Sequence, residues 1–270
     1  MRILTWNVRR AAGSSKVWDY IREADPCISM LQEVTQIPAD IQLSHHIAFE
    51  PAVRKTGKPQ SFGNAIISKL RLHEVDHLYS DVAWVNDIRS FFAGNLLMRN
   101  VTIANGRILN LLNIYSPAWS VPTHLTEGLD LAGVKLGLNP QLYCTEIIWK
   151  VLADSIARTS GEWIVGGDFN SSETFDHMWG PKPRGNRELM DRLNAAGLHD
   201  ALREKAGQLT PTFRSPRSGT VVHHMDHLYL TQNLMAEVEQ CSVPNPSAIF
   251  ANNLSDHLPI TAEFNMQPNL

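Results

Sequence analysis

The sequence predicts an α/β or α+β fold that is rich in β-strands. Short apolar runs of strand length recur along the chain, and several of them end in an acidic, amide or hydroxyl side chain. Stretches with the apolar spacing of a helix separate some of these runs. An Asn-Gly pair also stands between two apolar runs, which is typical of a β-hairpin.

The composition is that of a globular chain, and we expect a single domain over residues 1–270. Of its 270 residues, 43% are hydrophobic and 19% are charged, and no long low-complexity tract divides them. The net charge is −3, so no global positive field attracts nucleic acid and any polyanion site must be local. Three widely spaced cysteines favour buried free thiols, and the N-terminus shows no leader, so we expect a cytoplasmic location.

The first third of the chain predicts a β-α-β unit. The predicted elements are a strand over 3–8, a helix from about 15 to 24 and a strand over 27–31. The first strand ends at Asn7 and the second leads into Glu33. Because parallel strands bring the same ends to one edge of a sheet, these two side chains mark a potential site.

Further strands are predicted over 62–68, 72–79, 90–97, 97–103 and 107–115. Asn105-Gly106 lies between the last two and predicts a type I′ hairpin turn. A basic loop over 50–62 precedes this region. The last of these strands ends at Tyr115, again a polar residue at a strand end.

The second half of the chain repeats the pattern. Its predicted elements are a helix from Asn139-Pro140 to about Thr159, a strand over 163–168, a helix ending before Gly197, and strands over 225–230, 236–243 and 258–264. Gly166-Gly167-Asp168-Phe169-Asn170 closes the first of these strands, where a plain turn is the alternative interpretation. Asp226 lies in the next strand, and Asp256-His257 precedes the last.

The polar residues at these ends are Asn7, Glu33, Tyr115, Asp168, Asn170, Asp226, Asp256 and His257. In their local motifs and in this order, from residue 5 to residue 257, they resemble the endonuclease/exonuclease/phosphatase superfamily, the DNase I and exonuclease III-like phosphoesterases. The supporting motifs are Thr-Trp-Asn7-Val, Leu-Gln-Glu33-Val, Gly-Asn64-Ala-Ile, Asn113-Ile-Tyr115-Ser-Pro, Gly-Gly-Asp168-Phe-Asn170, Met-Asp226-His-Leu-Tyr-Leu and Ser-Asp256-His257. The resemblance implies a four-layer α/β/β/α sandwich with two mixed β-sheets packed face to face and helices outside.

The same resemblance implies metal-assisted hydrolysis of a phosphoester by in-line attack of water, with one or two Mg²⁺ or Mn²⁺ ions. Glu33 is the expected inner-sphere ligand, and Asn7 and Asp256 complete its surroundings directly or through water. Asp168 is expected to activate the water, with Asn170 orienting water and phosphate.

The resemblance leaves two roles open for His257, which Asp226 would align. It acts either as a cation on the phosphate or as the general base. Tyr115 is expected to bind the phosphate or to help protonate the leaving oxygen. Two departures from nucleic-acid-cutting relatives stand out, because Arg9 replaces an acid or amide and His224 replaces an Arg or Lys.

The substrate is less well defined by the sequence. Expected substrate-binding residues are Asn64, Asn113, Trp119, Arg184 and Arg187, and Trp179 and Lys182 lie in the same kind of loop. Arginines with aromatic residues favour a nucleic acid or nucleotide phosphodiester. The alternatives are a phosphatase or phosphodiesterase on an inositol, lipid or other small phosphoester and, from a different class, a non-catalytic binding module.

Overall fold

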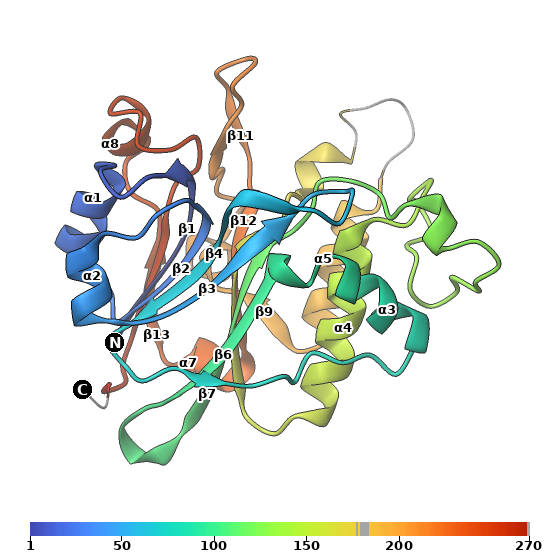
Figure 1. Ribbon diagram of the computed structural model, residues 1–270, viewed down its shortest axis with the longest axis horizontal. Helices are drawn as coiled ribbons and strands as arrows, with labels where there is room; N and C mark the ends of the chain where they lie inside the picture. Colours follow the sequence, from blue (N-terminus) through green and yellow to red (C-terminus); the bar gives the residue numbers. More distant parts are fainter. Residues whose placement is uncertain (177, 179–183, 269–270) are drawn as a thin grey trace.

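Two six-stranded β-sheets pack face to face, and helices cover the outer side of each sheet (Figure 1). The computed structural model describes residues 1–176, 178 and 184–268. The order of layers is helices, sheet, sheet, helices. The sandwich expected from the sequence resemblance is therefore confirmed.

The first sheet holds, in spatial order, β13 (Val238–Ser242), β14 (Ile260–Phe264), β1 (Arg2–Ala11), β2 (Ile28–Val34), β4 (Pro59–Ser68) and β3 (His46–Val53). The second holds β5 (His73–Glu74), β6 (Leu96–Thr102), β7 (Ile108–Tyr115), β8 (Glu162–Asp168), β12 (Asp226–Thr231) and β9 (Leu198–Asp200). Each sheet is mixed, because β1 and β2 run parallel in one and β7 and β8 run parallel in the other. A small hairpin of β10 (Phe213–Arg214) and β11 (Val221–His223) stands apart.

Helices α1 (Val17–Ala24), α2 (Ala39–Ser44) and α8 (Pro246–Phe250) contribute apolar side chains to the cluster on the outer side of the first sheet. Helices α3 (Ala83–Phe91), α4 (Cys144–Arg158) and α5 (Asn186–Ala195) do the same for the second sheet. The remaining elements are α6 (Ala201–Ala206), α7 (Gln232–Ala236) and the 3₁₀ turns η1 (Ala93–Asn95), η2 (Ala104–Gly106), η3 (Thr123–Leu125) and η4 (Glu173–Phe175). None of the helices in the described ranges is long and apolar enough to cross a membrane.

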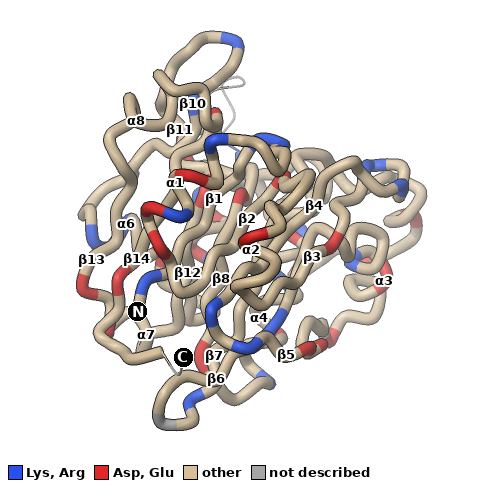
Figure 2. Tube along the Cα trace, turned by 60° about the vertical axis from the view of Figure 1, so that its left-hand side comes forward, with Lys and Arg blue, Asp and Glu red and all other residues tan. Residues whose placement is uncertain are grey.

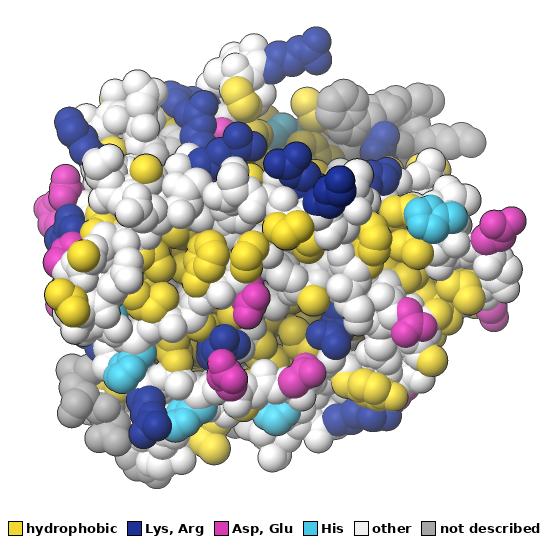
Figure 3. Space-filling view, viewed as in Figure 1, with side chains coloured by type: hydrophobic (Ala, Val, Ile, Leu, Met, Phe, Trp, Pro, Cys, Tyr) yellow, Lys and Arg dark blue, Asp and Glu magenta, His cyan; other side chains and the backbone are white. Residues whose placement is uncertain are grey.

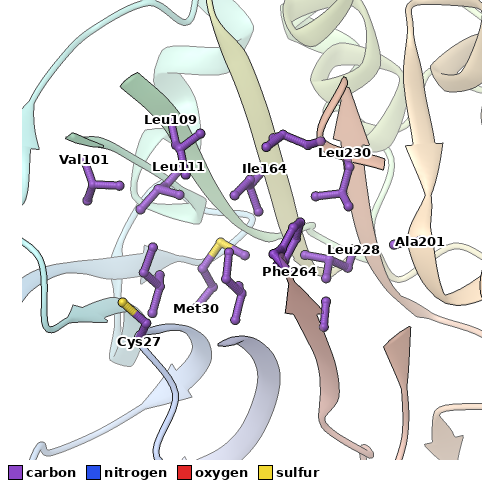
Figure 4. Close-up of a cluster of buried hydrophobic side chains, with 14 of the residues drawn as sticks. Cys27, Met30, Val101, Leu109, Leu111, Ile164, Ala201, Leu228, Leu230 and Phe264 are labelled. Atoms are coloured by element: carbon purple, nitrogen blue, oxygen red, sulfur yellow. The ribbon is translucent and has the colours of Figure 1, made fainter. Parts of the chain in front are cut away.

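The main core lies between the two sheets and contains Met30, Leu111, Ile164 and Leu228 (Figure 4). The sheets approach closely at Gly166, where an added Cβ would stand 2.5 Å from Cε of Met30. Only a residue without a side chain fits there unless Met30 moves. The glycine therefore allows the end of β8 to lie against the first sheet.

Asn113 also joins the two sheets, although it was expected to bind substrate. Its amide nitrogen donates to the carbonyl oxygens of Leu31 and Ala65 in the first sheet, both at 2.9 Å. Its amide oxygen accepts from Gln32 Nε2 at 2.6 Å, and the side chain is fully buried. Both ends of this amide are thus used between the sheets, and the structure does not place Asn113 where it could contact substrate.

Four local predictions differ from the structure. Of the strand predicted over 72–79, only the two residues of β5 are in a strand. Strands β6 and β7 do pair antiparallel, but their last pair is Thr102 with Ile108, and the 3₁₀ turn η2 replaces a two-residue type I′ turn. Much of the region over 90–97 belongs to the end of α3 and to η1. Helix α4 begins at Cys144 and not at Asn139, whose side-chain oxygen instead accepts from Gly185 N–H at 2.9 Å.

Candidate active site

Tyr115, Asp168 and Asp226 lie abreast on three adjacent strands of the second sheet. Tyr115 of β7 pairs with Asp168 of β8, and Asp168 pairs in turn with Asp226 of β12. The ends of the strands are thus aligned, so that three polar residues separated by more than fifty positions in the chain share one edge. This juxtaposition is what the pattern of polar strand ends predicted.

The first sheet contributes Asn7 and Glu33 to the same place. The pairing of β2 with β4 slips after Leu31, and Glu33 adopts a left-handed conformation with φ of 57°. Asn7 Nδ2 donates to Asp168 Oδ2 at 3.0 Å and lies 3.4 Å from Glu33 Oε1. Asn7 therefore connects the carboxylates of the two sheets.

The loop that carries Asp256 and His257 is fixed to the end of β1. Ser255 Oγ donates to the carbonyl oxygen of Asn7 at 2.7 Å, and Trp6 Nε1 donates to that of His257 at 2.8 Å. Both contacts join residues about 250 positions apart. They hold the loop where the two sheets meet.

Asp168 is the centre of the hydrogen-bond network. Its Oδ1 accepts from Asn170 N–H at 2.9 Å, and its Oδ2 accepts from Asn7 and, at 3.3 Å, from Asn170 Nδ2. Asn170 is itself left-handed, with φ of 48°, and donates to the carbonyl oxygen of Ser116 at 2.9 Å. Burial raises the pKa of the Asp168 carboxyl, although the positive charge of His257 opposes the rise. The carboxylate is therefore more basic than an exposed one.

His257 and Asp226 form a buried dyad. His257 Nδ1 donates to both oxygens of Asp226, at 2.8 and 3.0 Å, and its Nε2 lies 3.9 Å from Asp168 Oδ2. Burial alone would lower the pKa of His257, but the charges of Asp226 and Asp168 outweigh it and raise the pKa. Both charges favour the protonated imidazole, whose Nε2–H lies on the side of Asp168.

The base of the β10–β11 hairpin supports this dyad. Thr212 Oγ accepts from the backbone N–H groups of Met225 and Asp226, both at 3.1 Å. The ring of Phe213 lies tilted over the imidazole of His257, with centroids 4.8 Å apart. From this base the hairpin projects beyond both sheets (Figure 1).

Tyr115 stays protonated in this setting. Burial raises the pKa of its phenol, and the nearby charges of Glu33 and Asp168 raise it further. The ring packs edge-on against Phe62 at 5.7 Å. Tyr115 is thus a hydrogen-bond donor and not a base.

A family model described as "Endonuclease/Exonuclease/phosphatase family" matches residues 4–257 of the chain. The chain belongs to this family. Its members are phosphoester hydrolases, so the chain is placed among enzymes of this class. No curated protein sequence is significantly similar to it.

Solved structures share the family fold over nearly the whole length. An AP endonuclease from Archaeoglobus fulgidus is 18% identical, with a TM-score of 0.70 over 98% of this chain and 100% of the other. A 3′ phosphatase from Neisseria bound to a product DNA hairpin is 19% identical, with a TM-score of 0.68 over 98% and 99%. A 3′-5′ exonuclease from Neisseria meningitidis is 21% identical, with a TM-score of 0.67 over 98% and 99%. At these identities the likeness shows the fold alone.

Glu33 and Asp256 present carboxylate oxygens near this edge, the type of ligand that a hard divalent cation prefers. Both carboxylates keep 17% of their side-chain surface exposed, and their contacts with cations are long. Hard oxygen donors at an accessible edge fit Mg²⁺ or Mn²⁺. Asn7 Oδ1 accepts from Arg9 N–H at 3.0 Å, so this amide turns its nitrogen, and not its oxygen, toward the carboxylates.

Asp168, Asp226 and His257 also lie close enough together to hold an ion. However, the imidazole nitrogen Nδ1 is occupied by Asp226, and Asp168 already accepts three hydrogen bonds. The geometry of this trio suits proton transfer better than metal binding.

The expected substrate-binding residues are scattered. Arg184 lines a cavity of about 290 Å³ that Asn170 and Met225 also line, so it is near the site. Arg187 instead pairs with Glu173 at 2.5 Å and lines a separate cavity.

Two other expected contacts are engaged in packing, with Trp119 half-buried and Asn64 fully buried. Trp119 packs edge-on against Phe91 and Phe92. Asn64 is fully buried, and its amide nitrogen donates to the carbonyl oxygen of Gly94 in η1 at 3.2 Å. Trp179 and Lys182 lie outside the described residues.

A second buried network was not anticipated from the sequence. His227 Nδ1 lies 2.7 Å from Asp200 Oδ2, and its Nε2 lies 3.3 Å from the carbonyl oxygen of Ser171. His224 Nε2 is 3.5 Å from the same oxygen of Asp200, while its Nδ1 accepts from Thr210 N–H. Burial, followed by the charge of His227, lowers the pKa of His224 to about 4, so it is neutral. The network braces the turn after Asn170 against β9.

Arg9 and Arg10 are the site residues that the sequence pattern missed as functional groups. They follow Asn7 at the end of β1 and face Asp256 and Glu33. Arg9 stood out only as a departure from relatives. Two consecutive arginines in a sequence do not indicate that the backbone is left-handed there, although this conformation directs their side chains.

Proposed function

We propose that the chain is a divalent-metal-dependent phosphoesterase that hydrolyses phosphodiester bonds in nucleic acid or in a nucleotide. The observation that carries this proposal is the junction of Asp168, the His257–Asp226 dyad and the oxygen ligand Glu33 at one edge of both sheets. A proton acceptor, a cation and a metal ligand are the three groups that in-line attack of water on a phosphoester requires.

Glu33 and Asp256 would hold the ion, with Asn7 beside them. When bound, Mg²⁺ or Mn²⁺ supplies charge neutralisation at the phosphoryl oxygens. Coordination by the oxygen of Asn7 requires its amide to rotate, because the nitrogen faces the carboxylates. Glu33 is therefore the residue on which we place the ion first.

Asp168 acts as the general base in this proposal, and His257 acts as the cation on the phosphate. The charges of two carboxylates raise the pKa of His257, and a protonated imidazole cannot accept a proton. Asp168 has the opposite property, because burial raises the pKa of its carboxyl. Tyr115, which stays protonated, donates to the phosphate or to the leaving oxygen, and Asn170 orients the water.

The surface near the site favours an extended polyanion. Lys and Arg side chains gather along the upper rim of the face shown in Figure 3, although the whole chain has a net charge of −3. Arg217 is exposed in the loop between β10 and β11, and a basic position marks the tip of this hairpin in Figure 2. A strand of nucleic acid crossing the site would pass this rim, and counterion release would contribute to its binding. The Neisseria 3′ phosphatase with the same fold was solved with a product DNA hairpin.

A small phosphoester is the second candidate substrate. The cavity of about 290 Å³ beside Asn170 combines Arg184 with apolar residues such as Leu136 and Phe175. Such a pocket is large enough for the group attached to one phosphate. A sugar, a base or an inositol ring would each fit this description.

Purified protein with Mg²⁺ or Mn²⁺ should be incubated with plasmid DNA, a single-stranded oligonucleotide, a chromogenic phosphodiester and phosphoinositides. We expect hydrolysis of the nucleic acids and the chromogenic diester, and its loss in EDTA. Glu33→Ala should lose both activity and metal binding. If none of the substrates is hydrolysed and Glu33→Ala binds metal as well as the parent does, the enzyme assignment is refuted.

A further inference from the structure

Two consecutive arginines at the end of β1 face the two carboxylates that we propose as metal ligands. Arg9 Nε lies 3.6 Å from Asp256 Oδ2, and Arg10 Nε lies 3.8 Å from Glu33 Oε2. Both distances exceed those of a normal N–H···O hydrogen bond, which are about 2.7–3.2 Å. The guanidinium groups therefore stand close to these carboxylates without being locked onto them.

The backbone aims both side chains at the cost of strain. Arg9 and Arg10 have φ of 47° and 58°, a left-handed conformation that residues with a Cβ rarely adopt. The register of β1 with β2 breaks between Asn7 and Ala11, which marks a bulge. Glycine would adopt this backbone without strain, so the conformation alone gives no reason for arginine.

Neighbouring residues fix the bulge on both sides. Asn7 Oδ1 accepts from Arg9 N–H at 3.0 Å, and Thr35 Oγ donates to the carbonyl oxygen of Ala11 at 2.7 Å. The guanidinium of Arg10 stacks over the ring of Phe62, 5.1 Å from its centroid. Nevertheless, 49% of the Arg9 side chain and 66% of the Arg10 side chain are exposed. The bases of both side chains are held, while their charged ends are accessible.

We infer that Arg9 and Arg10 exchange partners when the site is loaded. They neutralise Asp256 and Glu33 in the metal-free protein, and they turn to the non-bridging oxygens of the substrate phosphate once a divalent cation has taken those carboxylates. The inference rests on the proposed function. Guanidinium groups suit the second task, because their planar N–H groups match a phosphate.

This exchange predicts opposite effects on two ligands. Removing either guanidinium removes a cation that competes with the metal, so the affinity for Mn²⁺ should rise about two- to fivefold, as for a weak exposed ion pair. The affinity of the metal-loaded protein for inorganic phosphate should fall about tenfold or more, because a charge-assisted hydrogen bond is lost. A residue with a merely structural role would weaken both or neither.

The test uses isothermal titration calorimetry on the whole chain, first with Mn²⁺ and then with inorganic phosphate at saturating Mg²⁺. The variants are Arg9→Gln, Arg10→Gln and Arg10→Gly. The glycine variant guards against misfolding, because it relieves the left-handed strain and should melt no lower than the parent. Arg22→Gln is the matched control, since Arg22 pairs with Asp19 and Asp40 on the surface of α1 and should leave both affinities unchanged.

Tighter Mn²⁺ binding together with weaker phosphate binding in the Arg9 or Arg10 variants supports the exchange. Unchanged affinities, or a loss of both, in a variant that melts like the parent would overturn it. If the parent protein binds no Mn²⁺ at all, the proposed function fails instead. The two failures are thus distinguishable without any measurement of turnover.

Discussion

Asp168→Asn should lose about 10²–10⁴-fold in kcat, the usual contribution of a general base, which equals about 3–5 kcal/mol of barrier. The shape of the side chain is kept. The amide oxygen of the variant would take the place of Oδ1 and still accept from Asn170 N–H, which lies 2.9 Å from Oδ1 in the parent. The amide nitrogen would take the place of Oδ2, where it would face another donor, Asn7 Nδ2, which lies 3.0 Å from Oδ2 in the parent. The two hydrogen bonds to Oδ2, from Asn7 Nδ2 and from Asn170 Nδ2, are lost, at about 1 kcal/mol each. The neutral amide avoids the cost of burying a charge, which is the cost that raises the pKa of this carboxyl, so the free energy of unfolding should change by no more than about 2 kcal/mol.

The assay is steady-state hydrolysis of a chromogenic phosphodiester with Mg²⁺, combined with urea denaturation of both proteins. Asp154→Asn provides a matched control, because Asp154 is also a buried aspartate but lies on α4, where it accepts from Ser80 Oγ. This control should keep its activity within a few-fold of the parent. A kcat of Asp168→Asn within a few-fold of the parent would show that another group activates the water.

Three further outcomes are expected. Glu33→Gln should weaken Mn²⁺ binding at least about tenfold by calorimetry, because the proposed inner-sphere carboxylate is lost. An unchanged affinity would show that the ion binds at other residues. Gly167→Ala should lower the free energy of unfolding by about 1–3 kcal/mol in urea, since its Cβ would clash with the backbone oxygen of Ile114 and its φ of 145° disfavours any residue with a Cβ, and an unchanged value would mean that β7 and β8 separate freely. The rate should rise with pH as Asp168 loses its proton, and this rise should lie above pH 4, the ordinary carboxyl value, because burial raises the pKa of Asp168. At higher pH the rate should fall as His257 loses its proton, and this fall should lie above pH 6.5, the ordinary histidine value, because the pKa of His257 is raised. An acid limb at about pH 4 would contradict the assignment of the base.

Much of the sheet architecture follows from local patterns. The runs ending at Asn7 and at Tyr115 are strands in the structure, because period-two alternation and β-branched residues report the pleat directly. The region over 90–97 was misassigned as a strand because its apolar residues, including Phe91 and Phe92, also serve a helix end packed on the second sheet. A short apolar run does not distinguish the two structures without its neighbours.

The candidate site was easier to predict than the groups around it. Asp168, Asp226 and His257 could be expected together because Asp168 ends a strand, Asp226 begins one and His257 lies shortly before one, and strand ends meet at sheet edges. Asn113 shares the same signal, yet its amide lies between the sheets, since sequence position does not show which way a strand end faces. The direction of the Arg9 and Arg10 side chains depends on the left-handed backbone of these two residues themselves. No sequence pattern predicts that conformation for arginine.

Asn7 and Glu33 come from one sheet, while Asp168 and Asp226 come from the other. Neither sheet carries a complete set of these groups by itself. Catalytic competence would therefore arise only when the two sheets pack against each other during folding, through contacts such as those of Asn113 and Gly166. In a refolding experiment, the return of activity would report the docking of the two halves and not the formation of either one.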